Sequence, residues 1–320
     1  MSLETAARAV EHWALDVREI GLVAQRENAV YRVTTKDDTH FALRLHRKGY
    51  QTDAALLSEL HWMQHLKAAG IDVPEPIPTA TGTLLTREDG FAVDLLSWLE
   101  GQPLGSISTP LDVADRNATF FAMGALMARV HAASDAWTPP DGFVRSAWDL
   151  DGLSGETPLW GRYWENPALT ADQAELLIAL RAIARRQLST HTLDVGLIHA
   201  DMVPENVLVA PHGLQLIDFD DSGYGYRLFD IATAALKYRA EPDIDALTQS
   251  LINGYHSVRP LDVTLLPLFM LLRAQTYLGW IMQRINEPGA AARQDRLIAT
   301  TFDMATAYQA TYRDQTGELP

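Results

Sequence analysis

The stretch that decides the fold is His199-Ala200-Asp201-Met202-Val203-Pro204-Glu205-Asn206, followed shortly by Ile217-Asp218-Phe219-Asp220. Between the two lie short apolar runs on either side of Pro211-His212-Gly213. Apolar runs flanking a tight Pro/Gly turn predict a β-hairpin, here with a three-residue loop that ends in glycine. Folding this hairpin symmetrically about His212 places Ala210 opposite Leu214. It also places Asn206 opposite Asp218, at roughly 5 Å.

Oxygen atoms gathered at the open end of this hairpin suit a divalent cation. An amide oxygen from Asn206 and a carboxylate from Asp218 are hard ligands, and magnesium completes such a shell with waters and phosphates. Asp220 lies two residues after Asp218 and faces the same way if the strand continues. It is either a second metal contact or, as the alternative, a solvated acid or a partner of a substrate amine. The pattern predicts a Mg²⁺ site.

Asp201 stands just before the first strand of the hairpin. In phosphoryl transfer, an aspartate on such a loop accepts or orients the proton of the substrate hydroxyl. The spacing His-x-Asp, with Asn five residues after the Asp, matches the catalytic loop of kinases. We therefore expect Asp201 to be the catalytic carboxylate and ATP to be the phosphoryl donor.

Two departures separate these motifs from eukaryotic-type protein kinases. Ala200 stands where Arg is usual, and Asp218-Phe219-Asp220 replaces Asp-Phe-Gly. With Leu228-Phe229-Asp230-Ile231-Ala232, the motifs resemble the aminoglycoside phosphotransferase, choline kinase and homoserine kinase group, and in particular its bacterial phosphotransferase members. The resemblance extends from about Glu27 to about Ala234.

This resemblance implies an α+β, protein-kinase-like fold with two lobes. A small antiparallel β-sheet with one helix would form residues 1–98, the nucleotide-binding lobe. A larger, mainly helical lobe for catalysis and substrate binding would form residues 99–320. The local patterns agree, since they predict a helix over 5–13, a hairpin over 28–45, a helix over 53–69, a hairpin over 84–96 about Asp89-Gly90, and a helix over 114–133.

The same layout implies three ATP-binding residues. Arg44 lies on a strand where kinases carry a lysine, and Glu59 lies on the next helix where the carboxylate partner of that lysine is found. A fixed cation neutralises phosphate charge and the acid holds the cation in place. Arginine for lysine is not a conservative change. Asn28, in the turn Gln25-Arg26-Glu27-Asn28, either caps the phosphates or is an ordinary turn residue.

Further residues near the motifs receive supporting or substrate roles. His199 is expected to hydrogen-bond backbone and shape the loop. The resemblance implies that Asp230 braces the catalytic loop, and a helix N-cap role is compatible with that. The substrate candidates are Glu205, Asp221, Tyr224 and Tyr226.

Composition narrows the function classes. Hydrophobic residues make up 47% and charged residues 21% of 320 residues, and there is no cysteine for a disulfide or thiolate site. The first residues lack the features of a secretory signal, and the apolar run 265–272 is too short to span a bilayer, so we expect a cytoplasmic protein. The net charge of −15 disfavours nucleic acid. It either draws a cationic substrate or aids solubility.

The function predicted from these observations is ATP- and Mg²⁺-dependent transfer of the γ-phosphoryl group to a hydroxyl of a small, possibly cationic, molecule. An amino alcohol, an amino sugar or a hydroxy amino acid such as homoserine would fit. Three alternatives are a bacterial Ser/Thr protein kinase, a catalytically weak nucleotide-binding module, and a metal hydrolase. Nothing in the sequence singles out one acceptor or an oligomeric state.

Overall fold

The computed structural model describes residues 2–25, 28–106 and 111–316. The chain forms two compact units, each composed of several segments. Unit 1 comprises Met1–Pro103, Ala133–Arg145 and Val207–Asp220. Unit 2 comprises Leu104–Ala132, Ser146–Asn206 and Asp221–Pro320. The predicted division into functional lobes at residues 98 and 99 stays a prediction.

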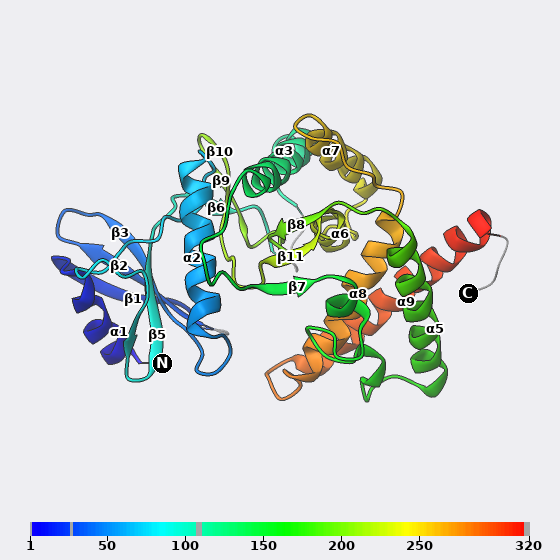
Figure 1. Cartoon of the computed structure of the whole chain (residues 1–320), viewed down its shortest axis with the longest axis horizontal. Coiled ribbons are helices and arrows are strands. Elements are labelled where there is room, and N and C mark those ends of the chain that lie inside the picture. Colours follow the sequence, from blue (N-terminus) through cyan, green and yellow to red (C-terminus); the bar gives the residue numbers. More distant parts are fainter. Residues whose placement is uncertain (1, 26–27, 107–110, 317–320) are drawn as a thin grey trace. The chain divides into compact units, whose positions relative to one another are not determined.

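Unit 1 is built on a five-stranded antiparallel sheet with the order β1-β2-β3-β5-β4. The strands are β1 (Val17–Gln25), β2 (Ala29–Thr35), β3 (His40–Leu45), β4 (Thr86–Glu88) and β5 (Phe91–Ser97). Helix α1 (Leu3–Val10), continued by the 3₁₀ turn η1 (Glu11–Trp13), lies beside this sheet (Figure 1). Its apolar residues share a core with those of the sheet. Helix α2 (Asp53–Ala68) follows β3.

Local sequence signals explain most of these elements. Thr52 caps α2 by accepting the backbone N–H of Ala55. Asp89 and Gly90 both have positive φ angles, as the two-residue turn between β4 and β5 requires. The two predicted hairpins and the helix between them are confirmed. Strand β1 was not predicted, because it is a mostly exposed edge strand with register shifts and no clean alternation.

The predicted hairpin after Asn206 is present, but its predicted register is wrong. Strand β9 (Val207–Ala210) pairs with β10 (Gly213–Leu216), and β6 (Gln102–Pro103) completes a second sheet of unit 1. Ala210 pairs with Gly213, so the loop contains two residues, not three, and the register moves by one. The expectation that Asn206 stands opposite Asp218 therefore no longer follows from the hairpin.

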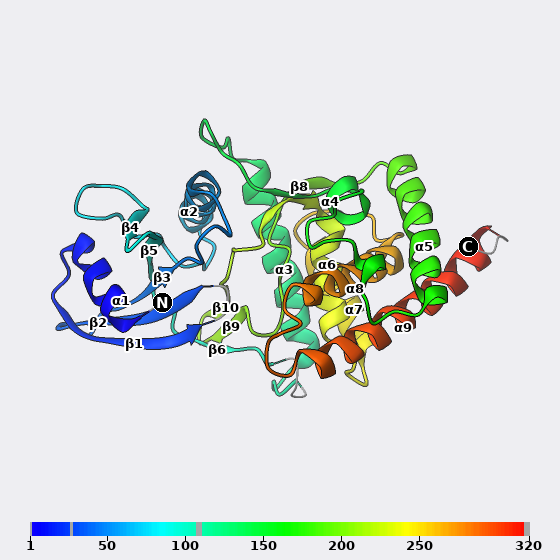
Figure 2. The same cartoon turned by 90° about the horizontal axis from the view of Figure 1, so that it is seen from below.

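Unit 2 is mainly helical. Its helices are α3 (Arg116–Asp135, which runs on into unit 1), α4 (Leu150–Ser154), α5 (Ala171–Thr190), α6 (Arg227–Lys237), α7 (Ile244–His256), α8 (Leu266–Met282) and α9 (Ala290–Thr316), with the 3₁₀ turn η2 (Tyr163–Glu165). Helix α8 is largely buried and packs against both α6 and α9 (Figures 1 and 2). The apolar run 265–272 therefore begins a buried helix, as predicted.

A small three-stranded sheet, β7-β11-β8, carries the candidate catalytic segment of unit 2. Its strands are β7 (Ser146–Trp148), β8 (Val195–Ile198) and β11 (Gly223–Tyr226). A Cβ atom on Gly223 would lie 2.1 Å from the carbonyl oxygen of Ser146, so only glycine permits this pairing. The sheet fixes the backbone that leads into His199.

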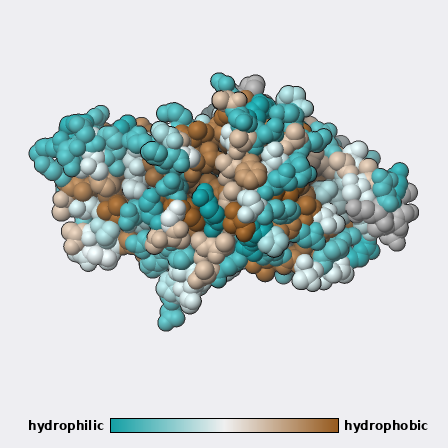
Figure 3. Space-filling view, turned by 90° about the horizontal axis from the view of Figure 1, so that it is seen from above, coloured by the Kyte–Doolittle hydropathy of each residue, from teal (hydrophilic) through white to brown (hydrophobic). Residues whose placement is uncertain are grey.

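The mixture of an antiparallel sheet and many helices confirms the α+β expectation. The face shown in Figure 3 mixes hydrophilic and hydrophobic residues, and its end over the sheet of unit 1 is largely hydrophilic. Within the described residues, no helix combines the length and the apolar character needed to cross a membrane.

Candidate active site

Asp201 lies in the loop between β8 and β9, and its carboxylate has two neighbours. Its Oδ2 atom accepts a hydrogen bond from the Nδ2 atom of Asn206 at 3.0 Å. Its Oδ1 atom accepts one from the Nη2 atom of Arg273 at 2.7 Å. The Asp201 side chain remains 24% exposed while Arg273 is fully buried. Unit 2 thus holds a partly open carboxylate from both sides.

The amide of Asn206 is oriented by the same contact. Its nitrogen also donates to the carbonyl oxygen of Asp201 at 2.9 Å. The nitrogen end therefore faces Asp201, which leaves the oxygen end to accept a metal. This donor set suits a hard cation such as Mg²⁺. Among the described residues, no group of three or more histidine or acidic side chains is placed to hold a metal ion.

Asp230 holds the backbone just ahead of Asp201. Its carboxylate, fully buried on α6, accepts the N–H groups of His199 at 3.0 Å and Ala200 at 2.7 Å. Ala200 has a φ angle of 65°, a left-handed conformation that alanine adopts at a cost of about 1–2 kcal/mol. The N-cap of α6 is Tyr226, so the N-cap role considered for Asp230 is wrong. The bracing contact is present.

Histidines complete this support. The Nδ1 atom of buried His199 accepts the N–H of Asp201 at 3.3 Å, so His199 contacts the loop backbone. His131 on α3 contacts Asp230 through Nε2 at 3.0 Å. Burial lowers the pKa of His131. Burial would raise the pKa of Asp230, but the hydrogen bond from His131 and the neighbouring donors outweigh it and lower that pKa.

Arg273 on α8 was not predicted as a site residue. Its guanidinium carbon lies 4.4–5.8 Å from four ring centroids, those of Trp148, Trp160, Phe229 and Tyr277. Its Nε and Nη1 atoms are buried and have no hydrogen-bond partner within the described part of the chain. Aromatic faces stabilise a desolvated cation. The rings of Trp148 and Trp160 therefore lie against the protein's own cation.

In unit 1, Arg44 pairs with Glu59 as expected, but it has a second partner. Its Nη1 atom donates to Oε1 of Glu59 at 2.8 Å, while Nε and Nη2 form a two-point contact with the carboxylate of Asp94 at 2.8 and 2.9 Å. His46 contacts the same carboxylate at 2.6 Å. Three donor atoms of Arg44 are thus occupied by acids, whereas a phosphate-binding cation needs donors in reserve. Its ATP-binding role stays a prediction.

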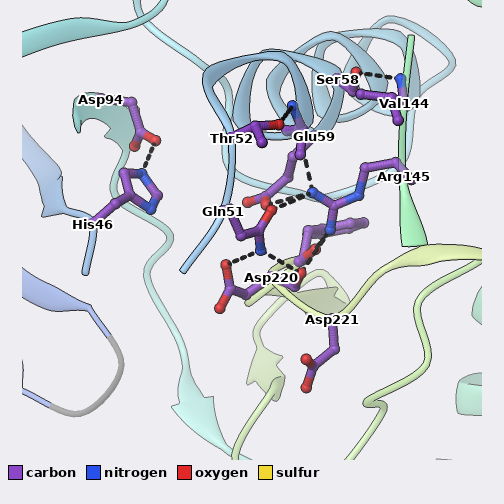
Figure 4. Close-up of polar contacts among 12 residues, drawn as sticks. His46, Gln51, Thr52, Ser58, Glu59, Asp94, Val144, Arg145, Asp220 and Asp221 are labelled. Carbon is purple, nitrogen blue, oxygen red and sulfur yellow. Dashed lines mark hydrogen bonds and ion pairs between the residues drawn. The ribbon is translucent and has the colours of Figure 1, made fainter. Parts of the chain in front are cut away.

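Arg145, also unpredicted, connects Glu59 with the segment that contains Asp220 (Figure 4). Its Nη1 atom donates to Oε2 of Glu59 at 3.3 Å. Its Nη2 atom donates to the carbonyl oxygens of Phe219 at 2.9 Å and Asp220 at 2.7 Å. Burial would raise the pKa of Glu59, but the charges of Arg44 and Arg145 outweigh it and lower that pKa.

The carboxylate of Asp220 faces a neutral partner in unit 1. Its Oδ1 atom accepts a hydrogen bond from Nε2 of Gln51 at 2.8 Å. Burial, together with the charge of Glu59, raises the pKa of Asp220. Asp220 is half-buried, and its alternative roles, a solvated acid or a partner of a substrate amine, stay predictions. Its metal role stays a prediction.

Asp218 and Asn28 occupy different settings in unit 1. The side chain of Asp218 is exposed and its backbone is left-handed, with a φ angle of 65°. Asn28 accepts the N–H of Arg47 through its Oδ1 atom at 3.2 Å, a turn-stabilising contact. The preceding residues Arg26 and Glu27, part of the same predicted turn, lie outside the described residues.

The four substrate candidates differ in exposure. Tyr224 is 41% exposed, whereas Tyr226 is buried and packs its ring on Phe269. Glu205 and Asp221 are half-buried, and the carbonyl oxygen of Asp221 accepts the indole N–H of Trp148 at 2.8 Å. Their substrate roles stay predictions.

Comparison with known proteins adds independent evidence. The profile of the family described as "Phosphotransferase enzyme family" matches residues 19–261. A homoserine kinase from Cupriavidus necator is 28% identical over 279 residues, which are 80% of this chain and 78% of that protein.

Two solved structures resemble the whole chain. A microcompartment-associated aminopropanol kinase superposes with a TM-score of 0.82 at 26% identity, covering 97% of this chain and 98% of that one. The amicoumacin kinase hAmiN, solved with AMP-PNP, Ca²⁺ and Ami, has a TM-score of 0.76 at 20% identity over 94% of this chain and 92% of that one. These similarities confirm the predicted kinase-like fold.

Proposed function

The chain belongs to the phosphotransferase enzyme family, a family of small-molecule kinases, and from that premise we propose that it transfers the γ-phosphoryl group of ATP to a hydroxyl of a small molecule. The acceptor is an amino alcohol, an amino sugar or a hydroxy amino acid such as homoserine. Among the relatives named above are a homoserine kinase and an aminopropanol kinase. We place the reaction in the cytoplasm, where ATP is available.

The observation that carries the proposal is the Asp201 carboxylate. It is partly exposed, held by Asn206 and Arg273, and follows a strained backbone that Asp230 braces. Strain retained by surrounding contacts is typical of functional positions. Asp201 orients the acceptor hydroxyl and receives its proton as the oxygen bonds to the γ-phosphorus, while the bond from that phosphorus to the β,γ-bridging oxygen breaks and its electron pair leaves with ADP.

Asn206 and Asp218 would hold a magnesium ion through their side-chain oxygens, with Asp220 as a further candidate. The hard oxygen donors and the amide orientation of Asn206 support this assignment. When bound, the ion would neutralise charge on the phosphates.

A screen by coupled ADP detection tests the proposal, with L-homoserine, aminopropanol, choline and kanamycin as acceptors. We expect Mg²⁺-dependent, acceptor-dependent ADP release from at least one of them. Asp201→Asn should lower turnover by at least about 100-fold, because the proton acceptor is lost, while nucleotide binding persists. Asp245→Asn is the matched control, since Asp245 is exposed on α7.

Survival of near wild-type turnover in Asp201→Asn would contradict the role of Asp201. Release of phosphate without ATP from a phosphate ester would favour a metal hydrolase, and phosphorylation of casein in place of the small acceptors would favour a protein kinase.

A second candidate, a nucleotide-binding module with weak transfer, is favoured by one observation. Three donor atoms of Arg44 are occupied by Asp94 and Glu59. Thermal stabilisation by ATP with Mg²⁺, but no ADP release with any acceptor, would support this candidate.

A further inference from the structure

Asp218 adopts a strained backbone without regular structure to support it. Its φ angle is 65°, and it follows the end of β10 at Leu216. Non-glycine residues seldom adopt this region, although aspartate enters it more readily than most, and the conformation is retained where neighbouring contacts select it. The residues that follow Asp218 must therefore be anchored.

Two side chains, those of Arg145 and Gln51, hold the residues after Asp218. The Nη2 atom of Arg145 donates to the carbonyl oxygens of both Phe219 and Asp220, the two residues after Asp218. The ring of Phe219 packs edge to face on the ring of Trp62 in α2, with 5.3 Å between the ring centroids. Gln51 adds hydrogen bonds to the backbone and carboxylate of Asp220 (Figure 4). The carbonyl groups of both residues after Asp218 thereby accept hydrogen bonds from Arg145.

Arg145 is itself rigidly held. Its Nη1 atom reaches Gln51, the carbonyl oxygen of Ala55 and the carboxylate of Glu59, and its side chain is only 2% exposed. A planar guanidinium with fixed donors can hold two carbonyls at once, which a lysine ammonium does less specifically.

We propose that Arg145 is a positioning residue for the metal ligand Asp218. By fixing the carbonyls of Phe219 and Asp220, it maintains the left-handed backbone of Asp218 and so presents its carboxylate already ordered for Mg²⁺. The inference rests on the proposed function. Residues that orient a metal ligand from behind typically contribute about 10- to 100-fold in metal affinity.

The test measures Mg²⁺ binding without turnover. The melting temperature is recorded with fixed AMP-PNP while Mg²⁺ is titrated, which gives the Mg²⁺ concentration at half-maximal stabilisation. Arg145→Lys keeps the charge beside Glu59 but loses the planar fork. We expect its half-maximal Mg²⁺ concentration to rise by about 10-fold or more, while stabilisation by AMP-PNP without metal is unchanged.

Two further variants keep the test decisive if Arg145→Lys folds poorly. Gln51→Ala removes the second contact to Asp220 and should raise the half-maximal concentration by a smaller factor. Ser58→Ala is the matched control, because it removes the hydrogen bond to Val144 from the same region of α2 without touching Phe219 or Asp220.

The outcomes separate the inference from the function. Lower melting temperatures with unchanged Mg²⁺ dependence in both Arg145→Lys and Gln51→Ala would overturn the inference, since they describe a purely structural role. An equal rise in Ser58→Ala would overturn it too. A wild-type protein without any Mg²⁺-dependent stabilisation would overturn the proposed metal-dependent function, and the inference with it.

Discussion

The two candidate catalytic segments are held by side chains of opposite charge. In unit 2 the carboxylate of Asp230 accepts the N–H groups of His199 and Ala200, whereas in unit 1 the guanidinium of Arg145 donates to the carbonyls of Phe219 and Asp220. Each anchor lies beside a left-handed residue. The sign of each buried charge follows from which backbone groups the turn leaves unpaired.

The two anchors also differ in how their own charge is compensated. Arg145 lies beside Glu59, which Arg44 shares, so acids and bases alternate in unit 1. Asp230 contacts the imidazole of His131 at 3.0 Å, and burial lowers the pKa of that histidine. Asp230 therefore depends mainly on hydrogen bonds, and Arg145 depends on ion pairs as well.

The largest expected effect is the loss of stability on neutralising Asp230, the residue that holds the catalytic loop of unit 2. Asp230→Asn keeps the size of the side chain but turns an N–H donor toward the N–H groups of His199 or Ala200. Because buried polar groups are left unpaired, we expect the free energy of unfolding to fall by about 3 kcal/mol. Urea unfolding at pH 7 measures this change in the free energy of unfolding.

The comparison would fail if Asp230→Asn cost no more than Asp245→Asn. Asp245 lies in the first turn of α7, as Asp230 does in α6, but it is exposed. A surface substitution of this kind changes stability by less than about 0.5 kcal/mol.

Arg273 extends the comparison, because its guanidinium contacts the side chain of Asp201, whereas the guanidinium of Arg145 contacts backbone carbonyls. Arg273→Met retains an apolar body among the four rings but loses the contact with Asp201. We expect kcat to fall by about 100-fold through misplacement of the carboxylate, with a smaller change in KM. Steady-state kinetics with the active acceptor measure both.

Arg273→Lys should recover part of the lost kcat, since an ammonium can still lie against the rings and reach Asp201. Equal losses in the two variants, or a loss confined to KM, would show that Arg273 does not position Asp201.

The smallest expected effect is on how the stability of the fold depends on pH in the acidic range. Asp230 and Glu59 have pKa values below their ordinary ones. Such carboxyls contribute stability above their unfolded-state pKa, and that stability is lost as the pH falls through the lower folded-state pKa. Thermal melts should show the wild type losing stability below about pH 4.5, and Asp230→Asn losing less over the same interval. Parallel curves would contradict this linkage.

Local patterns sufficed for much of the fold. The helix over 53–69 and the hairpin about Asp89-Gly90 were predicted because capping, periodicity and turn residues act over a few positions. The register after Asn206 was mispredicted because loop length sets it, and Pro211-His212-Gly213 is compatible with two lengths. A shift of one residue in the pairing register was enough to remove the argument that Asn206 and Asp218 stand opposite each other.

The supporting residues of the site could not be predicted, because their partners are distant in sequence. Arg145 lies 74 residues from Phe219, and Arg273 lies 72 residues from Asp201. One signal was present for Arg273, since it interrupts an apolar run that forms a buried helix. A charged residue in such a helix is seldom buried unless it is paired.

The left-handed backbone at Asp218 restricts which replacements the chain tolerates there for two separate reasons. Asparagine and aspartate are among the few side chains that accept this conformation readily. Replacement of Asp218 by asparagine would therefore remove the carboxylate without destabilising the folded state. A β-branched residue would remove the carboxylate and also destabilise the fold. Inactive descendants of this protein could thus persist as stable chains. At the position of Asp218 they would differ from it only by the exchange of aspartate for asparagine.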